Sequence, residues 1–157
     1  MSASPATSYH HTQKAALYWM FYALVPVFLI GAVSLSHEPP VAIILSVVGM
    51  MMLVVAASFH HLTVVDEGDR LAVQFGPLPL FRRTIRYEDM HRVEIGKTTL
   101  LDGWGIHLSL RGGWVWNIWG RDCVVIHHRG ILRVGTDDAE HLAQFLKTKL
   151  AGRVESV

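Results

Sequence analysis

The sequence predicts an α+β membrane protein, in which a two-helix transmembrane hairpin is followed by about seven antiparallel strands and a C-terminal helix. Two observations support this class. First, two long apolar runs at 15–36 and 41–59 contain no charged residue and lie only four residues apart. Second, the pattern after residue 59 changes to short alternating segments, which are typical of strands with one buried face.

Both apolar runs are long enough to cross a bilayer as helices. About 22 and 19 residues, at ~1.5 Å each, give roughly 33 and 29 Å, close to a hydrocarbon core of ~30 Å. Pro39 and Pro40 lie in the short break, where proline ends one helix and can begin the next. Neither run contains the ionisable residues that line ion or proton pathways, so the hairpin is expected to be an anchor.

The composition divides the chain into four parts. Residues 1–14 are polar and are expected to form a flexible N-terminal tail. The hairpin occupies 15–59, a folded domain 60–152, and a C-terminal tail 153–157. The start of the chain lacks the basic segment of a secretory signal, so the first apolar run is expected to be retained.

Basic residues indicate how the hairpin is oriented. Lys14 precedes the first run, Arg70, Arg82 and Arg83 follow the second, and the break between the runs has no Lys or Arg. Because positively charged flanks stay in the cytoplasm, both termini are expected there, on a multi-pass protein.

Small residues form a stripe on the second apolar run. Ala42, Ser46, Gly49 and Ala56 recur at helical spacing, and small side chains let membrane helices approach closely. Two interpretations follow. Either the stripe packs against the first run, or it joins two copies of the chain in a homo-oligomer.

Turn sequences organise the domain after the hairpin. The segments 66–69, 111–113 and 129–130 each separate two short alternating stretches, as expected for antiparallel hairpins. The sequence therefore predicts seven strands, at 62–65, 70–75, 81–87, 105–110, 114–119, 123–128 and 131–134, with 91–96 as a candidate for a further short strand.

One amphipathic helix is expected to close the domain. Asp137 is a good N-cap, and Glu140 three residues later completes a capping box. An apolar stripe follows at helical spacing, and Gly152 suits the end of the helix. The stripe consists of Leu142, Phe145, Leu146 and Leu150.

Three segments, 102–106 (DGWGI), 113–120 (GWVWNIWG) and 131–137 (ILRVGTD), resemble the bacterial PH-domain family. Residues 87–90 are similar to that family's Tyr-x-Asp-hydrophobic bend. The resemblance implies a seven-stranded antiparallel PH-like barrel closed by the C-terminal helix. It also implies a bacterial cytoplasmic (inner) membrane setting, because members often carry one or two spans before the domain. It transfers no active site, because the family's function is mostly unassigned.

The same resemblance argues against one binding mode. Eukaryotic relatives that bind phosphoinositides place Lys and Arg around their first hairpin. Here that hairpin turn, 66–69, contains Asp66, Glu67 and Asp69, which would repel a phosphorylated headgroup.

Tryptophans are the first candidates for an interaction surface. On a strand, Trp114 and Trp116 would share one face and Trp119 the other. One interpretation puts Trp114 and Trp116 in the core, which leaves Trp119 and the nearby Trp104 as candidates for a lipid interface or a protein partner. The alternative packs all of these rings inside the domain.

Basic residues are the second candidates. Arg82 and Arg86 lie soon after the membrane hairpin, where Lys and Arg attract anionic lipid. Glu88 and Asp89 follow directly, so these arginines are alternatively a solvated and partly neutralised strand face.

Composition and motifs disfavour several other classes. A net charge of +1 gives no field that would attract nucleic acid. The ten histidines form no H-E-x-x-H pattern and Cys123 lies in no C-x-x-C, so no metal or other cofactor is expected, although a histidine-based metal sensor stays an alternative. His107 and Ser109 lack a nucleophile elbow, and the chain is not expected to be an enzyme.

The function expected from the sequence is therefore a membrane-tethered, non-enzymatic interaction module. It would bind a protein or lipid partner at the cytoplasmic membrane face. The alternative is a structural or accessory subunit of a larger membrane protein complex, in which the spans do the binding.

Overall fold

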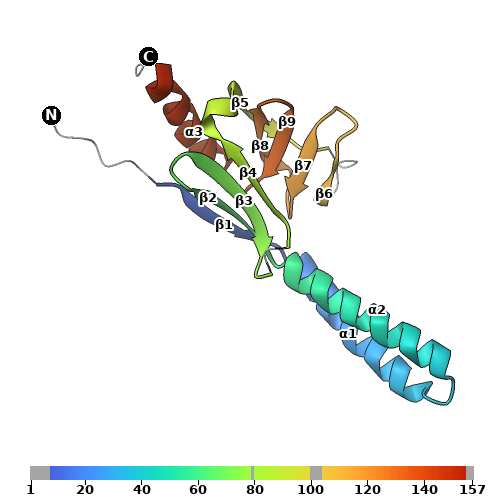
Figure 1. Ribbon diagram of the computed structural model, residues 1–157. Coiled ribbons are helices and arrows are strands. Elements are labelled where there is room, and N and C mark those ends of the chain that lie inside the picture. Colours follow the sequence, from blue (N-terminus) through green and yellow to red (C-terminus); the bar gives the residue numbers. More distant parts are fainter. Residues whose placement is uncertain (1–7, 79, 100–103, 155–157) are drawn as a thin grey trace.

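The computed structural model describes residues 8–78, 80–99 and 104–154. Within these ranges the chain forms three α-helices and two β-sheets, which confirms the mixed helical and β class. The first two helices extend together from one end of the β domain, as Figure 1 shows.

The elements follow one another closely along the described chain. In order they are β1 (His10–Lys14), α1 (Leu17–Ser34), α2 (Pro39–Ser58), β2 (His61–Asp66), β3 (Arg70–Gly76), β4 (Arg82–Arg86), the 3₁₀ turn η1 (Tyr87–Asp89), β5 (Arg92–Lys97), β6 (Gly105–Leu108), β7 (Trp114–Asn117), β8 (Asp122–His127), β9 (Ile131–Gly135) and α3 (Ala139–Val154).

Helices α1 and α2 pack side by side with close backbones. A side chain added at Gly49 would lie 3.2 Å from both Leu29 and Phe28 of α1. Gly49 and Ala56 are buried, whereas Ser46 is exposed and donates a hydrogen bond to its own helix. Packing within the chain, the first of the two interpretations, therefore holds for Gly49. Homo-oligomerisation through this stripe stays a prediction.

The two helices differ in length. Among the described helices, only α2 is both long and apolar enough to cross a membrane, while the helix over 18–34 is apolar but shorter. The predicted first span, 15–36, is thus not supported at its full length, and helix length alone does not support a multi-pass anchor. The reason is that β1 runs to Lys14 and Ala15 is buried in the core of the domain, so α1 begins only at Leu17.

The structure corrects the predicted N-terminal tail. Residues 10–14 form β1, which pairs with β2 in antiparallel register from His10 opposite Val65 to Lys14 opposite His61. The strand carries no apolar residue, so no alternating pattern marks it in the sequence. The strand is held by the backbone pairing with β2 and by the buried side chain of Gln13.

The strands form two sheets, with the orders β1-β2-β3-β4 and β5-β8-β9-β7-β6. The described residues therefore hold nine strands rather than seven, and the two sheets do not close into a barrel within them. Strand β7 pairs in parallel with β9, whereas the prediction had every strand antiparallel. The parallel pair arises because β8 lies on the far side of β9.

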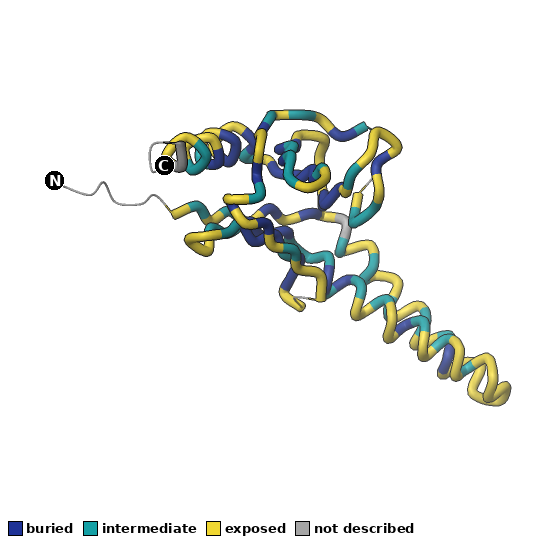
Figure 2. Tube along the Cα trace, turned by 45° about the horizontal axis from the view of Figure 1, so that its top comes forward, coloured by how far each residue is buried: buried dark blue, intermediate teal, exposed yellow. Residues whose placement is uncertain are grey.

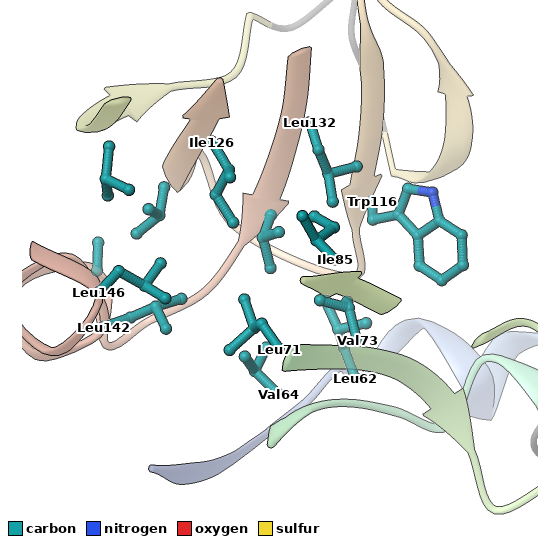
Figure 3. Packing of buried hydrophobic residues seen from close by; sticks show 14 of the residues in the cluster. Leu62, Val64, Leu71, Val73, Ile85, Trp116, Ile126, Leu132, Leu142 and Leu146 are labelled. Carbon is teal, nitrogen blue, oxygen red and sulfur yellow. The ribbon is translucent and has the colours of Figure 1, made fainter. Parts of the chain in front are cut away.

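A single apolar core lies between the sheets and α3. Figure 3 shows Leu142 and Leu146 of α3 at one end of this core and Trp116 at the other. Buried positions concentrate where the sheets and α3 meet, while α1 and α2 are largely exposed (Figure 2).

The C-terminal helix follows the predicted stripe. Leu142 and Leu146 are fully buried, and Phe145 and Leu150 pack against the core from partly buried positions, as predicted. The helix begins at Ala139, two residues after the predicted N-cap, and continues past the expected stop to Val154. Thr136 accepts a hydrogen bond from the Asp138 N–H just before the helix, at 3.1 Å.

Candidate interaction surface

An apolar pocket lies where the helices join the sheets. Its cavity has a volume of about 160 Å³. The walls come from the start of α1, the end of α2, the start of β6 and the end of β7. The lining residues are Tyr18, Phe21, Val55, Phe59, Trp104, Gly105 and Ile118.

Two tryptophans stack beside this pocket. The rings of Trp104 and Trp119 have centroids 4.7 Å apart and planes 21° apart. They meet because Trp104 precedes β6 and Trp119 follows β7, and these strands pair with Gly105 opposite Asn117. The two residues remain 48% and 43% exposed. The pair is therefore an accessible aromatic surface.

The strand-face prediction for the tryptophans is partly confirmed. Trp116 is buried in the core, with its ring 5.7 Å from that of Phe75, and Trp119 is at the surface, as in the first of the two interpretations. The prediction is wrong for Trp114, which is exposed because it begins β7 at the hairpin end, where the sheet stops. Contact of Trp104 and Trp119 with a partner stays a prediction.

Backbone contacts fix the position of Trp119. The Gln13 side chain donates a hydrogen bond to the Trp119 carbonyl at 3.2 Å, which links β1 to the end of β7. The Asn117 side-chain amide donates to the Gly120 carbonyl at 3.1 Å and closes the turn. The backbone around the exposed Trp119 ring is therefore held by two hydrogen bonds from side chains.

The predicted arginines lie elsewhere. Arg82 and Arg86 are on β4, in the four-stranded sheet, whereas the tryptophan pair adjoins the five-stranded sheet. Arg82 pairs with Glu67, and the Arg86 Nη1 lies 2.9 Å from the Glu88 carboxylate. Their charge is therefore offset locally, which favours the interpretation as a partly neutralised strand face. Their role in binding stays a prediction.

The histidines are dispersed among different contacts. In the described part of the chain, no group of three or more His, Cys, Asp or Glu residues could hold a metal ion. The His60 ring lies against Tyr18, with centroids 4.1 Å apart. Burial lowers the pKa of His61, and the neighbouring His60 and Lys14 act in the same direction. His11 instead contacts Asp137, with its Nε2 2.5 Å from Oδ1.

The pocket itself was not predicted. The sequence draws attention to Trp104 because of its neighbouring tryptophans, but Phe21, Phe59 and Ile118 carry no individual signal. The only hint is that Phe59 ends the second apolar run. Its partners come from distant parts of the chain, so only the fold brings them together.

No known family model matches the sequence, and no curated protein is significantly similar to it. Proposals on function therefore depend on the geometry of this surface.

Proposed function

We propose that the protein is a membrane-tethered, non-enzymatic interaction module that binds a protein or lipid partner at the cytoplasmic membrane face. The observation that carries this proposal is the exposed Trp104–Trp119 stack beside an apolar pocket, at the point where the helices leave the domain. Aromatic rings are enriched in binding interfaces and at the membrane boundary. Exposed apolar patches are uncommon on proteins without a partner.

The exposed faces of both helices support a membrane anchor. Large apolar side chains such as Ile30 and Val33 of α1 and Ile43 and Val47 of α2 are well exposed. Helix α1 has 18 residues, which at ~1.5 Å each gives about 27 Å. A bilayer accommodates a mismatch of a few Å by local thinning at modest cost. We therefore propose that α1 and α2 enter the bilayer together as a multi-pass hairpin.

Two features support an open, PH-like arrangement for the domain. Two sheets enclose one core, and α3 closes one end of it. The segments that resemble the bacterial PH-domain family fall at structurally distinct places: 113–120 covers β7 and the turn after it, 131–137 covers β9 and the approach to α3, and 87–90 contains η1. The segment 102–106 lies partly outside the described residues.

The β1–β2 pairing and the basic flanking residues support a common, cytoplasmic side for the start of the chain and the domain. Because β1 precedes the helices and β2 follows them, their pairing puts the start of the chain and the domain on the same side. The basic flanking residues favour the cytoplasmic side. We expect a C-terminal alkaline phosphatase fusion to be inactive and a C-terminal green fluorescent protein fusion to be fluorescent. An active phosphatase fusion would contradict this orientation.

Site-specific crosslinking in native membranes tests the interaction surface. A photo-crosslinking amino acid at position 119 of the full chain should form adducts with a protein or with lipid. The matched control is position 110, where Leu110 is 87% exposed at the tip of the β6–β7 hairpin. Equal yields at the two positions would contradict a specific surface. Stoichiometric recovery of other membrane proteins would instead support an accessory subunit.

A folding control accompanies this experiment. Trp119→Ser removes the ring stacking, worth about 0.5–1.5 kcal/mol beyond the area that the ring buries, and the domain should stay folded because the ring is 43% exposed. A loss of several kcal/mol in unfolding free energy would show that the stack is structural.

A further inference from the structure

A second apolar surface lies where β3 ends. Gly76, the last residue of β3, is opposite His61, the first residue of β2, and His61 is in turn opposite Lys14 of β1. All three positions lie next to the helix ends. The chain beyond Gly76 therefore projects from the sheet on the side where α1 and α2 leave it, as Figure 1 shows.

The residues at this place are apolar and exposed. Leu80 is 60% exposed, and Leu78 and Phe81 are exposed as well. Two backbone hydrogen bonds shape the loop: the Leu80 N–H donates to the Leu78 carbonyl at 2.8 Å, and the Phe75 N–H donates to the Phe81 carbonyl at 2.9 Å. These backbone bonds hold the loop, and the side chains of Leu78, Leu80 and Phe81 are exposed on it.

Aromatic contacts connect this loop to the end of α2. The ring of Phe81 lies 5.5 Å from that of Phe59, the residue that follows α2. Phe59 in turn lies 4.9 Å from Phe75 of β3. Through the Phe81 ring, the loop is therefore joined to the apolar end of α2.

We propose that Leu78, Leu80 and Phe81 enter the interfacial region of the bilayer leaflet from which the helices emerge. The inference rests on the proposed membrane anchor. The exposed Trp19 and the half-buried Tyr22, near the start of α1, mark the level of that interface, where such rings are enriched. The domain is then held to the membrane at the helices and at this loop.

Lipid is the occupant that the chemistry favours. The three side chains carry no polar group, so burial in lipid gains apolar transfer energy without leaving a polar side-chain atom unpaired. Phe81 also lies beside the end of α2, and the proposed anchor places the exposed apolar surface of that helix in lipid. The exposed Lys14, opposite His61 at the same end of the sheet, suits phosphate headgroups at this level.

Labelling of cysteines introduced one at a time into the full-length protein in nanodiscs tests the inference. Leu80→Cys and Leu78→Cys report on the loop, and Val47→Cys reports on the middle of α2. Leu110→Cys reports on an exposed leucine in the β6–β7 turn, at the opposite end of this strand pair from the pocket beside the helices. Each variant carries an environment-sensitive fluorophore, with and without lipids brominated along the acyl chain. The unmutated protein controls for labelling of Cys123, which is buried.

We expect the fluorophore at positions 78, 80 and 47 to emit at shorter wavelength and to lose intensity in brominated lipid. The fluorophore at position 110 should show neither effect. Water-like emission at 78 and 80 with quenching at 47 would overturn the inference and leave the anchor intact. A blue shift at 80 without lipid quenching would identify a protein contact and would overturn it too. Absence of quenching at 47 would refute the anchor, and the inference with it.

Discussion

Replacing Leu146 with alanine should lower the unfolding free energy of the full-length protein by about 2–5 kcal/mol. Leu146 is fully buried in the core, on the face of α3 that covers the sheets. The substitution removes buried methyl groups and leaves a cavity that the packed strands cannot fill. A loss of this size is a large part of the ~5–15 kcal/mol that stabilises a small domain.

The neighbouring Lys147 provides the matched control. It is exposed on the same helix, so Lys147→Ala should change the unfolding free energy by less than about 0.5 kcal/mol. Denaturant unfolding followed by tryptophan fluorescence compares the two variants in the same detergent. Equal midpoints for Leu146→Ala and the unmutated protein would show that α3 is not docked on the core.

The second large effect is expected at Asp66. Its side chain is 5% exposed and lies 3.0 Å from the Lys149 ammonium of α3. It also accepts hydrogen bonds from the Tyr87 hydroxyl at 2.8 Å and the Gly68 N–H at 2.9 Å. This carboxylate therefore connects the end of β2 to both η1 and α3.

We expect Asp66→Asn to lower the unfolding free energy by about 1.5–3 kcal/mol, the range of hydrogen bonds to charged groups. The loss is limited because Lys149 is 24% exposed and can turn towards water. Asp69→Asn is the control, since the Asp69 carboxylate bonds Arg70 at the surface. Equal losses in the two variants, measured by urea unfolding at pH 7, would contradict the central role of Asp66.

The same contacts make stability depend on pH. Burial by itself would raise the pKa of Asp66, but hydrogen bonds from Tyr87, Lys149 and Gly68 outweigh it, so the pKa lies below its usual range. The folded state then holds fewer protons than the unfolded state in acid. The stability from Asp66 is complete above the ordinary value of about 4 and is lost as the pH falls through the lower folded pKa. The difference in unfolding free energy between the unmutated protein and Asp66→Asn should therefore become smaller below about pH 4. A difference in unfolding free energy that stays constant from pH 7 to pH 3 would contradict this link between Asp66 and stability.

Local patterns predicted several elements correctly. The apolar runs indicated helices at α1 and α2, and the spacing from Leu142 to Leu150 indicated the buried face of α3. Each of these signals lies within one segment of the chain, as an uninterrupted apolar run for α1 and α2 and as helical periodicity for α3. The exposure of Trp119 agrees with one of the two interpretations of the strand faces, which placed it opposite Trp116.

The remaining features depend on contacts between distant segments. β1 has a polar sequence, so only its pairing with β2 makes it a strand. The parallel pairing of β7 with β9 depends on where β8 lies, which no local pattern encodes. Trp114 was misplaced because the alternation rule assumes a strand that is covered along its whole length.

The position of the helices between β1 and β2 has a consequence for biosynthesis. Lys14 pairs with His61, so β1 leaves the ribosome 47 residues before its partner. At ~5–20 residues per second, β1 waits roughly 2–10 s for that partner. During this interval both helices are synthesised, and under the proposed membrane anchor the unpaired strand stays on the ribosome's side of the membrane. Completion of the four-stranded sheet therefore comes after the emergence of both helices, which links translation and folding in a fixed order.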